Sequence, residues 1–158
     1  MDKKILIVCA DEQLLKDISK LLEQSLKTNM VNADEIVEIE VIKHPNVSLS
    51  NADSVMNDIE KNVILRLVDE NKAISISPEM FVSNKNFKRF DRFVKVYIKL
   101  SKNNLISKIN YNNNAKTQQR LVMLDEIDLL LDKLCTITLI GDNKSPILLS
   151  KEIELLIK

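Results

Sequence analysis

The chain of 158 residues is 45% hydrophobic and 29% charged with a net charge of zero, a composition typical of one ordinary globular domain. Its single glycine, Gly141, excludes a Walker A loop and a dinucleotide-binding fingerprint, because both motifs need several glycines. Its single histidine, His44, leaves no residues for a zinc site or for Ser-His-Asp catalysis.

No apolar run approaches the ~20 residues of a membrane span, and the N-terminus lacks a signal-peptide pattern. We therefore expect a cytoplasmic protein without membrane contact. Cys9 and Cys135 lie at the edges of apolar runs and have no C-x-x-C or histidine partner, so we expect buried, reduced thiols. We expect neither a metal nor a cofactor.

The N-terminal stretch predicts a strand that leads into a helix. Residues 5–9 form an uninterrupted apolar run, which is typical of a strand buried on both faces. From Gln13 onward the apolar residues recur at helical spacing, up to Leu26. A buried strand followed by an amphipathic helix is the first half of a βαβ unit, so we expect a parallel sheet with this strand in its middle.

The next segments predict two further strands with a helix between them. Residues 36–42 alternate in part and predict a strand near a sheet edge. Residues 52–59 carry apolar side chains at helical spacing after Ser50 or Asn51, either of which can cap a helix. Residues 63–68 form an apolar run that predicts the third strand, ending at Asp69.

The middle of the chain predicts β-hairpins rather than another regular βα unit. Residues 73–77 alternate and can fold back on the third strand, while residues 94–100 and 105–111 can pair as a second hairpin. Beyond the asparagines at 112–114, residues 121–134 predict a helix, 135–140 a last strand and 147–157 a final helix. The expected fold is α/β, three-layered, with a mainly parallel sheet.

Several of these segments resemble the receiver domain of bacterial response regulators. Residues 51–69 (NADSVMNDIEKNVILRLVD) are similar to the second helix and third strand of a receiver, which end at the phosphorylated aspartate. The resemblance implies a flavodoxin-like fold and makes Asp69 the phospho-acceptor candidate. Ser101 after the 94–100 strand resembles the switch hydroxyl, and Lys144 before Pro146 resembles the lysine-proline step, so both are switch candidates.

The resemblance departs from the receiver pattern where the acidic pair should follow the first strand. Cys9 and Ala10 stand at these positions, and Asp11 and Glu12 lie further along. Magnesium needs oxygen ligands, which a thiol and a methyl group do not supply. We therefore expect a pseudo-receiver: a single domain over residues 1–158 with a basic aromatic insertion around 70–112. Its expected function is that of a non-enzymatic regulatory module acting through protein-protein contacts.

A basic segment supports an alternative function. Residues 85–120 contain ten basic residues and one acidic residue, and all six aromatic residues lie between Phe81 and Tyr111. Such a composition is typical of a surface that follows phosphates and stacks bases, so the alternative is a nucleic-acid-binding transcriptional regulator. The aromatic residues equally fit a buried core, and the lysines equally fit the solvent-exposed face of an edge strand. The expected partner is a protein, a second copy, DNA or RNA, and the candidate binding residues are Lys85, Lys88, Arg89, Arg92, Lys95, Tyr97, Lys99 and Lys102.

Overall fold

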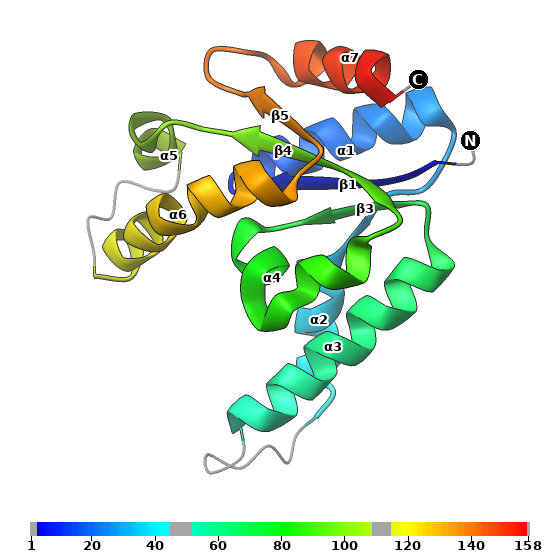
Figure 1. Cartoon of the computed structure of the whole chain (residues 1–158), viewed down its shortest axis with the longest axis vertical. Coiled ribbons are helices and arrows are strands. Elements are labelled where there is room, and N and C mark those ends of the chain that lie inside the picture. Colours follow the sequence, from blue (N-terminus) through cyan, green and yellow to red (C-terminus); the bar gives the residue numbers. More distant parts are fainter. Residues whose placement is uncertain (1–2, 45–51, 109–114, 158) are drawn as a thin grey trace.

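The computed structural model describes residues 3–44, 52–108 and 115–157, and its centre is a five-stranded parallel sheet (Figure 1). The strands lie in the order β2-β3-β1-β4-β5. Their bounds are β1 Lys4–Cys9, β2 Val31–Asn32, β3 Ala73–Ile76, β4 Phe93–Lys99 and β5 Ile137–Ile140. The predicted α/β class is therefore confirmed, and the expected first strand is central and parallel to both of its neighbours, β3 and β4.

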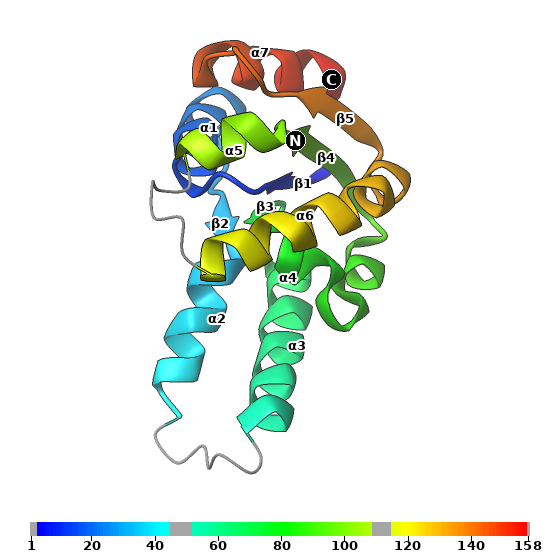
Figure 2. The same cartoon turned by 90° about the vertical axis from the view of Figure 1, so that its left-hand side faces the viewer.

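Helices cover both faces of the sheet, so the molecule has three layers. One face carries α1 (Glu12–Leu26) and α7 (Pro146–Ile157), which pack against each other. The other face carries α2 (Ala33–Ile42), α3 (Ala52–Glu70), α4 (Pro78–Val82) and the 3-10 helix η1 (Ser83–Phe90). Figure 2 shows α2 and α3 running side by side away from the sheet. The helices α5 (Lys102–Lys108) and α6 (Ala115–Leu134) follow the carboxyl end of β4.

Strand β1 is buried on both sides, as its apolar run predicts. Ile5, Ile7 and Cys9 face the core under α1 and α7, whereas Leu6 and Val8 face the core under α3 and α4. All five side chains are at most 1% exposed. Helix α1 then buries the stripe Leu14, Leu15, Ile18 and Leu22, which confirms the predicted helix.

The predicted second strand, residues 36–42, is wrong, because this segment is helix α2. Asn32 caps the helix by accepting a hydrogen bond from the Glu35 amide, and Asp34 and Glu35 place negative charge in the first turn. Together these local signals outweigh the partial alternation of apolar residues. The true second strand is the short segment just before the cap, Val31–Asn32.

The predicted third strand, residues 63–68, is also wrong, because it belongs to helix α3. Val63, Ile64, Leu67 and Val68 are buried and lie on one helical face, whereas Leu65 is 42% exposed. The third strand is instead β3, which pairs in parallel with β1 and does not fold back as a hairpin. Both predicted caps, Ser50 and Asn51, lie outside the described residues.

The second predicted hairpin is wrong where the structure describes it, since residues 102–108 form helix α5. The remainder of that prediction, residues 109–111, and the predicted loop at 112–114 lie outside the described residues. In contrast, the predicted final helices and strand are confirmed as α6, β5 and α7.

The strand order contradicts the predicted flavodoxin-like fold. A receiver places its strands in the order 2-1-3-4-5, with the first strand between the second and third. Here β1 lies between β3 and β4. The order differs because the segment that we took for the third strand is helical, and β3 enters the sheet between β1 and β2.

Both cysteines are free and buried, which confirms the prediction for Cys9 and Cys135. Among the helices of the described residues, none is long and apolar enough to cross a membrane.

Candidate functional site

A cleft of about 400 Å³ opens at the carboxyl ends of β1, β2 and β3. Helix α1 leaves β1 toward one face of the sheet, whereas α4 leaves β3 toward the other. The two strands therefore mark a point where the connections diverge, which is where open α/β sheets bind ligands. We call this hollow the acidic cleft; it is lined by Cys9, Glu12, Leu15, Lys16, Asn32, Asp34, Glu35, Glu38, Ser77, Glu79 and Arg120.

The floor of the acidic cleft is fixed by hydrogen bonds between Asp34 and Ser77. The two carboxylate oxygens of Asp34 accept from the Ser77 amide at 2.7 Å and from the Ser77 hydroxyl at 2.6 Å. The Ser77 hydroxyl also accepts from the Met80 amide and so caps α4, with Pro78 in the first turn. Burial raises the pKa of Asp34 above its usual value of 3.8, and the bonds from Ser77 oppose this shift.

A second set of contacts, made by Arg120 of α6, lines one side of the cleft. The Arg120 guanidinium donates to the Glu79 carboxylate at 2.9 Å and 3.4 Å, and its Nη2 donates to the Ala10 carbonyl at 3.0 Å. Both charged side chains are about three-quarters buried, with 25% and 27% exposed. Arg120 thereby joins α6, α4 and the end of β1.

The charges that line the acidic cleft are unbalanced. Five carboxylates face two cations, and each cation is already paired with a carboxylate of the cleft, Arg120 with Glu79 and Lys16 with Glu35. Asp34 is occupied by Ser77. Within the described residues, Glu12 and Glu38 have no ion-pair partner. The cleft therefore offers two free carboxylates and attracts positive charge.

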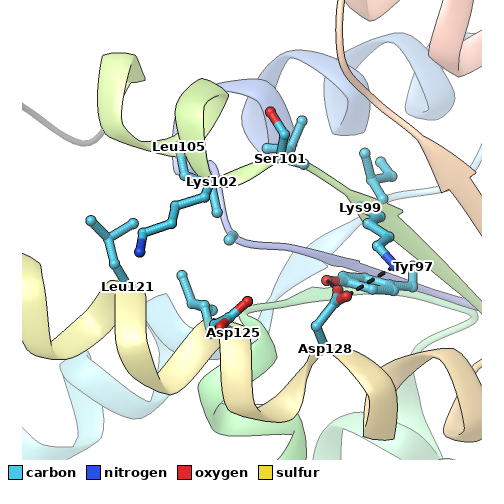
Figure 3. Close-up of a pocket in the computed structure, with 12 residues that line it drawn as sticks. Tyr97, Lys99, Ser101, Lys102, Leu105, Leu121, Asp125 and Asp128 are labelled. Carbon is cyan, nitrogen blue, oxygen red and sulfur yellow. Dashed lines mark hydrogen bonds and ion pairs between the residues drawn. The ribbon is translucent and has the colours of Figure 1, made fainter.

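A smaller pocket of about 220 Å³ lies between α5, α6 and the carboxyl end of β4 (Figure 3). Leu105 and Leu121 form an apolar wall, and Tyr97 and Lys99 lie at the opposite end. The Tyr97 hydroxyl donates to Asp128 at 2.6 Å, and Lys99 contacts both Asp128 and Asp132, at 2.9 and 3.1 Å.

These groups satisfy one another and tie α6 to β4. Burial, followed by the hydrogen bond to Asp128, raises the pKa of Tyr97 well above its usual value. Hydrogen bonds to Asp128 and Asp132 raise the pKa of Lys99. The Tyr97 hydroxyl and the Lys99 ammonium group thus stabilise the fold through these contacts.

The structure does not bring the predicted phosphorylation residues together. Asp69 lies in α3, four residues before the start of β3, and its side chain is 76% exposed and paired with Arg92. Ser101 follows the end of β4, and Lys144 follows the end of β5 and binds Glu152. Because the strands are parallel, Asp69 lies at the amino edge of the sheet, while Ser101 and Lys144 lie at the carboxyl edge. Asp69 is therefore not placed as an acceptor between the two switch candidates.

The candidate nucleic-acid residues do not form one surface either. Lys85, Lys88 and Arg89 belong to η1, and Arg92 precedes β4, whereas Lys102 follows β4 at the opposite edge of the sheet. Lys95 donates to the Phe90 and Phe93 carbonyls, and Tyr97 and Lys99 are engaged with the aspartates of α6. Three of the aromatic residues that could have stacked on bases, Phe81, Phe90 and Phe93, are instead core residues that are at most 4% exposed.

Sequence reasoning missed the residues that build the acidic cleft. Ser77 was predicted in a strand and Arg120 in the basic segment, whereas Asp34 and Glu79 were not singled out. Two local signals could have found Asp34, Ser77 and Glu79. Asn32 and Glu35 have the spacing of a helix cap and its acidic partner, and Ser77-Pro78-Glu79 is a typical start of a helix. No local signal places Arg120 beside Glu79, because that contact joins segments 41 residues apart.

No protein-family model and no curated protein matches the sequence. Solved structures do match it. The shikimate kinase from Acinetobacter baumannii, in complex with shikimate, has a TM-score of 0.79 and 12% identity, over 99% of this chain and 93% of that one. The shikimate kinase from Aquifex aeolicus has a TM-score of 0.71 and 18% identity, over 98% and 95%. That from Bacteroides thetaiotaomicron has a TM-score of 0.74 and 11% identity, over 98% of each chain.

These similarities correct the function that we expected from the sequence. The predicted pseudo-receiver is wrong, because the similar structures are shikimate kinases. The same finding contradicts the expectations of a non-enzymatic regulatory module and of a nucleic-acid-binding transcriptional regulator. Across almost its whole length, the chain has the fold of the shikimate kinases.

Proposed function

We propose that this chain binds a small cationic molecule that carries hydroxyl groups, and that it does so in the acidic cleft. The observation that carries the proposal is the excess of carboxylates in a cleft at the diverging ends of β1 and β3. Its volume of about 400 Å³ falls within the range of small-molecule sites. The charge and the hydrogen-bonding groups of the lining residues determine which small molecules fit.

Charge favours a cation as the ligand. The free carboxylates of Glu12 and Glu38 lie on α1 and α2, so an ammonium group between these helices gains attraction from both. A carboxylate in the same place meets net negative charge, because Lys16 and Arg120 are already neutralised.

Hydroxyl groups suit the remaining polar atoms of the cleft. The Asn32 amide nitrogen donates to Ser75, and its oxygen accepts from Glu35, so one polar lining group is held in a fixed orientation. The Glu79 carboxylate is likewise held by Arg120. Fixed acceptors of this kind bind hydroxyl groups without losing side-chain freedom.

The similar fold supports a small hydroxylated ligand but not the same charge. One shikimate kinase of this fold is in complex with shikimate, which is itself a small hydroxylated molecule. Shikimate carries a carboxylate, however, and the acidic cleft disfavours an anion. The proposed ligand therefore differs from shikimate in the sign of its charge.

Isothermal titration calorimetry with three matched sugars tests the proposal. Glucosamine, glucose and glucuronate share a ring and hydroxyl groups and differ in charge. We expect glucosamine to bind most tightly and glucuronate most weakly, and we expect added salt to reduce the difference. Binding of glucuronate in preference to glucosamine would contradict the proposal, as would equal binding of all three.

Substitutions locate the binding. Glu12→Gln and Glu38→Gln each remove one free carboxylate, and each is expected to weaken glucosamine binding about tenfold, the change that a lost charged contact produces. Glu154→Gln on α7 is the matched control, because it makes the same chemical change outside the cleft. Equal losses in all three variants would show that overall charge, rather than the cleft, attracts the ligand.

A further inference from the structure

A kinase fold implies a nucleoside triphosphate, and the residues after β1 can be tested for it. A Walker A loop places glycines, a lysine and a hydroxyl residue between a strand and the following helix, so that backbone amides surround the phosphates. Here only Ala10 and Asp11 join β1 to α1. The first helical residues, Glu12, Gln13 and Leu14, include neither a cation nor a hydroxyl. These residues do not fit a nucleotide phosphate.

The amino terminus of α1 is instead occupied by a carboxylate of the chain itself. Asp11 is 8% exposed, and its Oδ1 accepts hydrogen bonds from the amides of Gln13 at 3.1 Å and Leu14 at 3.2 Å. A helix amino terminus is an anion-binding position because its first amides lack partners within the helix. Asp11 supplies the anion at this position.

The Arg120 guanidinium at this edge is also occupied by a carboxylate of the chain. Arg120 reaches across from α6 to the Ala10 carbonyl, directly beside Asp11. Its guanidinium is held by both oxygens of Glu79, which is the geometry in which arginine binds a carboxylate or a phosphate. Glu79 thus fills the arginine site that a phosphate would need.

We infer that Asp11 and Glu79 take the places of nucleotide phosphates in this chain, so that its own carboxylates hold the α1 amides and Arg120. A triphosphate arriving at this edge meets the Asp11 and Glu79 carboxylates, which already accept hydrogen bonds from the Gln13 and Leu14 amides and from Nε and Nη2 of Arg120. The two carboxylates lie where no glycine-rich loop is present. They give the helix terminus and the arginine the partners that would otherwise be lacking.

The variant Asp11→Asn/Glu79→Gln tests the inference. Asparagine still caps a helix, and glutamine keeps the size of glutamate, so both changes remove charge with little change of shape. We expect pyrophosphate and magnesium-ATP to bind the wild type only weakly. We expect the variant to bind pyrophosphate at least about tenfold more tightly than the wild type, because two repulsive charges are gone.

The matched control is Asp69→Asn/Glu70→Gln. It removes the same net charge and also releases an arginine, Arg92, but at the amino edge of the sheet. We expect this control to bind pyrophosphate no better than the wild type. An equal gain in the control would overturn the inference, because overall charge would then account for binding.

Amide chemical shifts in ¹⁵N-labelled protein give the location. In the Asp11→Asn/Glu79→Gln variant, pyrophosphate is expected to shift the amide signals of Gln13 and Leu14. Magnesium-ATP that shifted these two signals in the wild type would overturn the inference, and so would a failure of the variant to gain any affinity. Neither result depends on glucosamine, so failure here is distinguishable from failure of the proposed ligand site.

Discussion

Replacing Ile64 with alanine tests the helical assignment of residues 63–68, which is where the sequence was most misleading. Ile64 is 0% exposed and lies in the core between α3 and the sheet. Isoleucine to alanine removes three carbon groups, which at about 0.8 kcal/mol each gives about 2.4 kcal/mol, and the residual cavity adds to this. We expect a loss of about 3 kcal/mol in the free energy of unfolding.

The neighbouring variant Leu65→Ala provides the matched comparison. It also removes three carbon groups, but Leu65 is 42% exposed and points away from the core. We expect a loss of about 1 kcal/mol or less. If this segment were the predicted strand and were buried on both faces, the two substitutions would instead be similarly costly.

Urea unfolding followed by far-ultraviolet circular dichroism measures both variants, since the chain has no tryptophan for fluorescence. The slope of free energy against urea should stay constant, because neither substitution is expected to change the surface exposed on unfolding. Similar losses in the two variants, or a larger loss in Leu65→Ala, would refute the helical assignment and with it the identification of β3.

Three further predictions concern single groups. Tyr97→Phe removes the hydrogen bond to Asp128 and is expected to lower the free energy of unfolding by about 1.5 kcal/mol, measured by urea unfolding; an unchanged value would show that the bond contributes nothing. Burial raises the pKa of Cys135 to about 12. A disulfide reagent at pH 8 should therefore label this thiol slowly in the folded protein and rapidly in urea. Fast labelling of Cys135 in the folded protein would contradict its burial. Burial also raises the folded-state pKa of Asp34 above 3.8. The stability that Asp34 contributes is therefore full below that value and is lost as pH rises through the raised pKa, so the wild type should lose stability relative to Asp34→Asn over this pH range. A constant difference in unfolding free energy between the two proteins would refute the shift.

The sequence predicts most of the N-terminal and C-terminal segments correctly, because there the local pattern and the tertiary environment agree. Residues 5–9 are apolar without interruption and become the central strand, and the buried stripe of α1 consists of Leu14, Leu15, Ile18 and Leu22. For α6 and α7, helical spacing of apolar residues leads to the same agreement.

The sequence misleads between residues 31 and 76 because short apolar runs fit a strand and a buried helix equally well. Residues 63–68 have the spacing of a helical face, but their length and β-branched residues suggest a strand. Because of the two wrong strands, β2 was not predicted, and β3, predicted as a strand over residues 73–77, was given a hairpin pairing in place of its parallel pairing with β1. The cleft at the carboxyl ends of these strands was therefore not predicted. The cap signals at Asn32 and Ser77 were present in the sequence, whereas the contacts of Arg120 are purely tertiary.

Titration of ¹⁵N-labelled protein with glucosamine tests most directly whether the acidic cleft is a ligand site. We expect the amide signals of Asn32, Glu35, Glu38 and Ser77 to shift in proportion to occupancy, and those of Leu105 and Asp125 beside the smaller pocket to stay in place. Shifts confined to the smaller pocket, or no shifts at any glucosamine concentration, would contradict a ligand site in the acidic cleft.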